Sequence, residues 1–153
     1  MQKITPFLWF DNNAEEAIAF YTSIFKDAKA GNLHRMPDGK IITGTFQLHG
    51  QDFMVLNGGP MFKFTPAISF FVNCATQEEV DELWEKLTAD GGSEERCGWL
   101  KDKFGLSWQI IPEALGRLMG DKDPQKAKRV MDAMLTMNKI DSKKLQEAYD
   151  GES

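Results

Sequence analysis

The feature that most constrains the fold of this chain is an internal repeat with a spacing of 63 residues. The acidic pair Glu15-Glu16 opens one amphipathic helical pattern, and the pair Glu78-Glu79 opens a second one 63 positions later. The apolar positions that follow also align, namely Ala17, Phe20, Tyr21 and Ile24 with Val80, Leu83, Trp84 and Leu87. A repeat of this length corresponds to one supersecondary unit that cannot bury its apolar faces alone. The two copies are therefore predicted to pack as a pair.

Each copy has the same predicted order of elements, which is a strand, a helix and then three strands. In the first copy the patterns predict a strand over 4–10, a helix over 14–25, and strands over 32–36, 41–49 and 52–56. In the second copy they predict a strand over 66–72, a helix between Thr76 and Asp90, and strands over 93–97, 98–102 and 106–111. The sequence thus predicts an α+β fold made of two βαβββ modules.

The chain is long enough for one domain with a real core, which we expect to span 1–153. We place module 1 at about 1–60, module 2 at about 66–112 and an extra helical tail at 113–153. The tail carries a methionine-rich face that includes Met131, Met134 and Met137. Such a face is typical of core or dimer packing, and a partner-binding stripe is the alternative.

The composition is that of an ordinary soluble domain, and it argues against two classes of partner. A net charge of −5 leaves no basic surplus to neutralise the phosphates of nucleic acid or of an anionic membrane. No apolar run approaches the roughly 20 residues that span a bilayer, and no signal-peptide pattern is present. The spacing of Cys74 and Cys97 fits neither a zinc cluster nor a disulfide framework. We therefore expect a cytoplasmic protein with reduced thiols.

The last predicted strand carries the most informative polar side chain. In Lys103-Phe-Gly-Leu-Ser-Trp-Gln-Ile-Ile-Pro112, Gln109 is the one strong polar residue of the apolar strand, and alternation points it away from Trp108. The same alternation points Leu8, Ser69 and Phe71 inward, and Trp9, Phe70 and Trp108 towards helices. The predicted ligand pocket comprises Leu8, Met54, Asn57, Ser69, Phe71, Trp99 and Gln109. Apolar walls with few polar groups suit a small organic ligand, and a simply filled sheet interior is the alternative.

Several segments are typical of one known superfamily. They are Pro6-Phe-Leu-Trp-Phe10, Ala14-Glu-Glu-Ala17, Phe20-Tyr21, Cys97-Gly-Trp-Leu-Lys-Asp-Lys-Phe-Gly105 and Ser107-Trp-Gln-Ile110, with Ala127-Lys-Arg-Val-Met-Asp-Ala-Met134 and Lys139-Ile-Asp141 in the tail. With them, nearly the whole chain resembles the vicinal oxygen chelate (glyoxalase, bleomycin-resistance and dioxygenase) superfamily, and within it the PhnB-like group. The resemblance implies curved mixed sheets with a cavity inside and helices outside. It also implies a homodimer, often with strands or modules exchanged.

Members of the group are often labelled 3-demethylubiquinone methyltransferases. The sequence does not support that activity, because no Gly-rich nucleotide loop follows a strand and opens a helix.

The resemblance also implies where a divalent metal would bind. Metal-dependent members place His, Glu or Gln on the first and last strands of each unit. These positions fall here at about Pro6, at Leu56 or Asn57, near Ala67 and at Gln109. Proline and alanine cannot ligate, and a catalytic metal normally needs about three protein ligands. We therefore predict neither a metal site nor another cofactor.

No catalytic residue is identified from the sequence. His34 and His49 lie by hairpin turns, and neither is predicted to be functional. Lys101 and Asp102 stand beside the Gly105 turn, where a catalytic pair is conceivable. A solvated charge pair at a turn is the favoured interpretation.

Three functions remain open, and whether the chain is an enzyme is left undecided. The first is a metal-free, glyoxalase-like protein that binds a small hydrophobic or aromatic molecule. The second is a metal-dependent lyase, isomerase or dioxygenase of the superfamily, which needs carboxylates or imidazoles inside the cavity. The third is a dimeric interaction module with a vestigial cavity.

Overall fold

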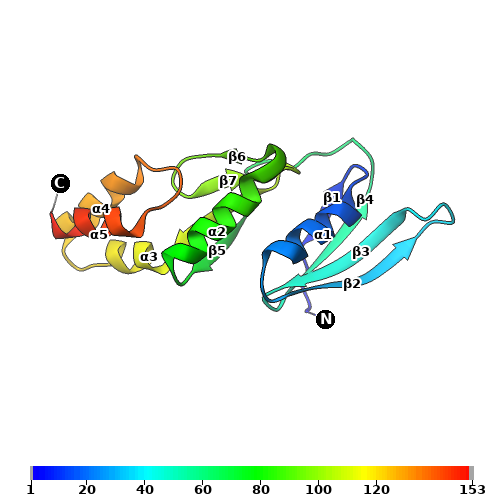
Figure 1. Cartoon of the computed structure of the whole chain (residues 1–153), viewed down its shortest axis with the longest axis horizontal. Coiled ribbons are helices and arrows are strands. Elements are labelled where there is room, and N and C mark those ends of the chain that lie inside the picture. The colour runs from blue at the N-terminus through cyan, green and yellow to red at the C-terminus, as the bar shows by residue number, and fades with distance from the viewer. Residues whose placement is uncertain (1, 152–153) are drawn as a thin grey trace. The chain divides into compact units, whose positions relative to one another are not determined.

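The computed structural model describes residues 2–151, which form two compact units. Unit 1 reaches as far as Phe64, and unit 2 begins at Thr65. The boundary falls in the segment 58–68, which contains neither helix nor strand. Figure 1 shows a sheet with its helix in each unit, and further helices that follow at the C-terminal end of unit 2.

Unit 1 is a four-stranded sheet with one helix. Its elements are β1 (Phe7–Phe10), α1 (Ala14–Ile24), β2 (Ala28–Arg35), β3 (Ile41–Leu48) and β4 (Gln51–Asn57). The strand order is β1-β4-β3-β2, with β1 parallel to β4 and the other neighbours antiparallel. The predicted βαβββ order is confirmed. Strand β2 starts at Ala28 rather than at 32, because a register shift between Ala30 and Leu33 interrupts the alternation that marks a strand.

Helix α1 covers one face of this sheet. A Cβ atom on Gly44 would lie 3.2 Å from Cδ1 of Ile18 on α1, so Gly44 marks the helix face. Gly44 pairs in register with Val55, and Val55 pairs with Leu8, which places both buried side chains on the same face. The opposite face carries no helix among the described residues of unit 1. We call it the uncovered face.

Unit 2 repeats this arrangement. It contains β5 (Ser69–Cys74), α2 (Gln77–Thr88), the short 3-10 helix η1 (Ala89–Gly91), β6 (Ser93–Glu94), β7 (Trp99–Lys101) and β8 (Ser107–Pro112). The strand order is β5-β8-β7-β6, with β5 parallel to β8. Strand β6 ends earlier than predicted, because the chain turns between Arg96 and Trp99 and Cys97 takes a left-handed backbone conformation (φ 61°).

The helix face of unit 2 is apolar. Trp108 on β8 packs edge-to-face against Phe70 on β5, with ring centroids 5.3 Å apart. Leu100 and Ile110 lie on the same face and are fully buried. The apolar side of α2 is buried as well, through Val80, Leu83, Trp84 and Leu87. The other face of this sheet, which carries Gln109, is the uncovered face of unit 2.

The turn between β7 and β8 is built around Asp102. Its carboxylate is buried and accepts hydrogen bonds from the backbone N–H of Phe104 at 2.9 Å, the backbone N–H of Leu106 at 3.1 Å and Nε1 of Trp108 at 2.9 Å. Gly105 completes the turn at φ 86°, a conformation that favours glycine. The interpretation of Asp102 as a solvated charge is therefore wrong. This carboxylate fixes the start of β8.

Three C-terminal helices build a further core in unit 2. They are α3 (Glu113–Met119), α4 (Pro124–Met134) and α5 (Ser142–Asp150). The core comprises Ile111, Leu115, Leu118, Val130, Ile140 and Leu145, and Met134 and Met137 pack against it. Met131 and Leu135 stay exposed, so only part of the methionine-rich face is core. None of the helices within residues 2–151 has the length and apolar character needed to cross a membrane.

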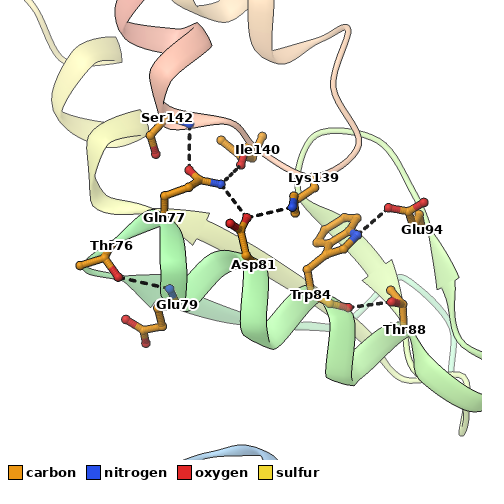
Figure 2. Close-up of polar contacts among 10 residues, drawn as sticks. All are labelled: Thr76, Gln77, Glu79, Asp81, Trp84, Thr88, Glu94, Lys139, Ile140 and Ser142. Atoms are coloured by element: carbon orange, nitrogen blue, oxygen red, sulfur yellow. Dashed lines mark hydrogen bonds and ion pairs between the residues drawn. The ribbon is translucent and has the colours of Figure 1, made fainter.

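Helix α2 holds the segment that leads into α5. Figure 2 shows the Gln77 amide between two backbone groups, where Nε2 donates to the Ile140 carbonyl at 2.8 Å and Oε1 accepts from the Ser142 N–H at 2.9 Å. Lys139 reaches the Asp81 carboxylate at 2.8 Å. The hydrogen bond from Lys139 holds the pKa of Asp81 below its ordinary value, and a second one from Gln77 adds to this.

Replacing Asp102 by Asn should destabilise the protein by about 2–3 kcal/mol, because one of three buried donors then loses its acceptor. Urea unfolding followed by tryptophan fluorescence measures this loss. Asp38→Asn is the matched control, since Asp38 also accepts from a turn N–H, that of Lys40 at 2.9 Å, but is exposed. The control should change stability by less than about 0.5 kcal/mol. Equal losses for the two variants would contradict a special role for the buried carboxylate.

Replacing Asp81 by Asn should flatten the acid dependence of stability. A carboxyl whose pKa is lowered on folding contributes stability above its unfolded pKa of about 3.9, and this contribution is lost as the pH falls through the folded value. The gap between wild type and Asp81→Asn should therefore be largest near neutral pH and close in acid. Urea midpoints of the two proteins from pH 7 to pH 2 measure this gap. A gap that is independent of pH would refute the linkage.

Candidate functional site

The uncovered face of unit 2 carries a polar pair within an aromatic surround. The side chain of Gln109 on β8 donates from Nε2 to the hydroxyl of Ser69 on β5 at 3.0 Å. Phe71 is the register partner of Gln109 on one side, and Trp99 is its partner on the other side. Phe71 is 60% exposed, while Trp99 and Gln109 are partly buried. The structure thus brings four of the predicted pocket residues together on one face.

A second hydroxyl group lies beside this pair. Ser107 is the register partner of Ser69 and precedes Gln109 by two positions, so it belongs to the same face. It is fully buried, and its Oγ has no hydrogen-bond partner among the described residues. Ile111 follows on this face and packs into the core of the C-terminal helices. Those helices therefore border one end of the site, and Ser107 is a polar residue that the sequence did not single out.

The chemistry of this group is hydrogen bonding rather than acid–base catalysis. An amide and two aliphatic hydroxyls do not ionise near neutral pH, so they lack the pKa that a general acid or base needs. With Nε2 of Gln109 engaged at Ser69, the Oε1 atom and one N–H remain to contact another molecule. Such a group can orient a carbonyl or hydroxyl of another molecule.

The uncovered face of unit 1 consists of cross-strand rows of side chains. The rows are Lys29, Gln47 and Asp52; Thr45, Met54 and Phe7; and His34, Thr43, Leu56 and Trp9. Met54 is the predicted pocket residue that lies here. The Trp9 indole is held by an edge-to-face contact with Phe62 at 4.9 Å and by donation from Nε1 to the Gly59 carbonyl at 2.9 Å.

Two predicted pocket residues of unit 1 lie on the helix side instead. Leu8 is buried in the core beneath α1, and Trp9 points to the uncovered face, so the predicted orientations of both are wrong. Strand β1 is apolar on both faces, so alternation in the sequence does not show which of its residues face the helix. Asn57 is used structurally, since its Oδ1 accepts from the Ala14 N–H at 2.9 Å and its Nδ2 donates to the Ile41 carbonyl at 3.1 Å. It caps α1 from the end of β4 and does not join the inner wall.

The side chains at the superfamily's metal positions do not fit a divalent ion. The first and last strands of unit 1 present Phe7 and Leu56 on the uncovered face, and neither can ligate. In unit 2 only Gln109 has a suitable oxygen. Within residues 2–151, no group of three or more His, Cys, Asp or Glu side chains lies close enough together to hold a metal ion. His34 lies on the uncovered face of unit 1, opposite Thr43, while His49 packs against Phe25 in the turn after β3.

The structure also explains three further reactive side chains, those of Cys74, Lys101 and Asp102. Burial raises the pKa of the Cys74 thiol to about 12, with a smaller effect from the charge of Glu79. Cys74 is therefore not a nucleophile at neutral pH. Lys101 lies 3.9 Å from Glu95, while Asp102 serves the turn, so these two side chains do not form a catalytic pair.

Comparison with protein families gives a match over most of the chain. The sequence model described as 3-demethylubiquinone-9 3-methyltransferase matches residues 2–111. The chain belongs to this family. The matched region contains both βαβββ modules and stops before α3, so the C-terminal helices lie beyond it. No curated protein matches the chain.

One solved structure is similar to this chain in both sequence and fold. The putative 3-demethylubiquinone-9 3-methyltransferase, PhnB protein, from Bacillus cereus is 39% identical, and the match covers 72% of this chain and 99% of that one with a TM-score of 0.68. Protein PA1353 from Pseudomonas aeruginosa is 20% identical over 74% of this chain and 98% of that one, with a TM-score of 0.61.

A third structure shows that the fold also occurs in a fosfomycin resistance protein. The fosfomycin resistance protein FosX from Listeria monocytogenes, solved as a mutant with Mn(II), is 18% identical over 71% of this chain and 90% of that one, with a TM-score of 0.54. At such identities PA1353 and FosX show the fold alone. The predicted α+β class and the resemblance to the PhnB-like group are confirmed.

The loops of this family member do not resemble a nucleotide-binding motif. The connection from β1 to α1 is Asp11-Asn-Asn13, and the connection from β5 to α2 is Ala75-Thr76. Neither contains glycine, whereas phosphate-binding loops between a strand and a helix depend on glycine for close backbone approach. The word methyltransferase in the family description therefore has no counterpart in these two connections.

Proposed function

We propose that this protein binds a small hydrophobic or aromatic molecule on the uncovered face of unit 2, without a metal ion. The observation that carries the proposal is the hydrogen bond between Gln109 and Ser69 at 3.0 Å, set between Phe71 and Trp99. Aromatic side chains provide apolar contact area for a ligand, and a few neutral polar groups fix its orientation through hydrogen bonds. This combination is typical of sites for small organic molecules.

The polar group favours a ligand edge that both accepts and donates hydrogen bonds. Oε1 of Gln109 accepts, while the Ser69 hydroxyl and the second N–H of the amide donate. A planar ring with a hydroxyl or carbonyl substituent meets this pattern and packs against Phe71 or Trp99. We infer that the ligand is a neutral aromatic molecule of this kind.

Thermal-shift measurements with phenols, quinones and aromatic amides test the proposal, each with EDTA and with added Zn²⁺, Mn²⁺ or Ni²⁺. At a hundred times its dissociation constant a ligand stabilises the protein by about 2.7 kcal/mol. For a domain of this size, that raises Tm by about 5–10 °C. The shift should persist in EDTA and should fall by more than half in Gln109→Ala. Gln47→Ala, which removes a partly buried glutamine from unit 1, is the matched control and should keep the full shift.

Two outcomes would contradict the proposal. A shift that requires the divalent ion would favour the alternative, a metal-dependent lyase, isomerase or dioxygenase of the superfamily. A metal-independent shift that survives Gln109→Ala unchanged would place the ligand elsewhere.

We also propose that the chain forms a homodimer that uses exposed apolar side chains of the segment 58–68. Met61 at the end of unit 1 and Ile68 at the start of unit 2 are 77% and 60% exposed, and large exposed apolar side chains are candidates for an interaction surface. Light scattering should give about twice the chain mass of 17.3 kDa. The double variant Met61→Ser with Ile68→Ser should lower that mass, whereas Met36→Ser, which removes an exposed methionine from a hairpin, should not. A monomeric wild type would contradict this proposal and also the alternative function as a dimeric interaction module.

A further inference from the structure

A hollow of about 130 Å³ lies on the uncovered face of unit 1. Its lining includes Lys29 on β2, Thr45 and Gln47 on β3, and Asp52 and Met54 on β4. It shares no residue with the group around Gln109, which belongs to unit 2. It is thus a separate candidate site, with different chemistry.

Opposite charges stand at the two ends of this hollow. Lys29 pairs in register with Gln47, and Gln47 pairs with Asp52, so the three side chains form one row across three strands. Because neighbouring strands are about 4.8 Å apart, the Cα atoms of Lys29 and Asp52 are separated by about 10 Å. Gln47 donates from Nε2 to one Asp52 oxygen at 2.8 Å, which leaves the other oxygen available. Lys29 forms no ion pair with any residue in the described range 2–151.

An irregularity in β2 shapes the wall of the hollow. The register of β2 against β3 shifts between Ala30 and Leu33, at a bulge that contains Gly31. The Thr45 hydroxyl accepts from the Asn32 N–H at 3.0 Å and occupies the space that a Cβ atom on Gly31 would take. This hydroxyl keeps its own proton for donation to another molecule. The bulge thereby brings a hydrogen-bond donor to the edge of the hollow, between the two charges.

We propose that this hollow binds a short linear zwitterion, whose carboxylate contacts Lys29 and whose ammonium group contacts Asp52. Its volume corresponds to about four water molecules at roughly 30 Å³ each, so the ligand has few heavy atoms. A singly charged molecule leaves either Lys29 or Asp52 without an opposite charge, so the hollow should prefer a zwitterion. The Thr45 hydroxyl bonds the ligand carboxylate, and Met54 contacts its methylene groups.

An NMR titration of the full chain tests this site with glycine, β-alanine and γ-aminobutyrate. Butyrate and butylamine are the singly charged comparison compounds. At least one zwitterion should shift the backbone amide signals of 29–31, 45–47 and 52–54 in a saturable way. Butyrate and butylamine should each bind about tenfold more weakly, or about 1.4 kcal/mol, because each lacks one charged contact.

Matched charge variants separate a specific site from a general charge effect. Lys29→Gln and Asp52→Asn should each weaken binding of the zwitterion about tenfold. Lys26→Gln and Asp27→Asn remove exposed charges nearby that do not line the hollow, and they should leave binding unchanged. Thermal unfolding of all four variants confirms that they are folded. Gln109→Ala should not affect this titration, so the site stands or falls independently of the function proposed for unit 2.

Three results would overturn the inference. One is the absence of saturable shifts with all three zwitterions. Another is binding of butyrate or butylamine as tight as that of the best zwitterion, which would make the hollow an anion or a cation site. The third is an equal loss of binding in Lys26→Gln or Asp27→Asn.

Discussion

Each module has four strands but a single helix of its own, and this imbalance between strands and helices determines which sheet face remains open for binding. A helix of 11 or 12 residues covers one face of its sheet and leaves the other to solvent, a ligand or another surface. The C-terminal helices do not remove the imbalance, because they pack around Ile111 while Phe71 on the same face stays 60% exposed. Both candidate binding sites therefore lie on the faces that the modules cannot cover with their own helices.

Asp102 and Asn57, which the sequence offered as candidate functional residues, stabilise the fold instead. Asp102 joins the turn before β8 to the Trp108 indole on the helix face, which pins the register of the strand. A slip of one residue would turn Gln109 into the core, so this carboxylate indirectly sets the direction of the amide. Asn57 does similar work in unit 1, where it ties the end of β4 to the start of α1. Both side chains have their hydrogen bonds committed within the fold.

The order of the elements was predictable because the repeat and the turn residues are local signals. Strand β8 was assigned correctly because Gln109 is a single polar marker that fixes which face each neighbour takes. In β1 no such marker exists, and Leu8 and Trp9 were assigned to the wrong faces. The role of Asn57 rests on contact with a residue 43 positions away, for which the sequence has no local pattern.

The charged hollow of unit 1 was not predictable for a related reason. Lys29, Gln47 and Asp52 come together only through strand register, and a bulge shifts that register in β2. The pairing of three strands, rather than any motif, creates the row. A sequence pattern with period two cannot show which residues of different strands stand side by side.

The polar group of unit 2 differs physically from the ligand set of a metal enzyme. Carboxylates that ligate one metal repel one another when the ion is absent. Gln109 and Ser69, in contrast, are joined by a hydrogen bond that needs no bound ion. The face is therefore organised without a ligand, and binding there as proposed would require little ordering. The same bond would limit the affinity of the proposed ligand, since a ligand that takes this amide N–H must replace an interaction already made. On the proposed function, selectivity would then depend on packing against Phe71 or Trp99 and on the ligand's ability to use Oε1, which has no partner among the described residues.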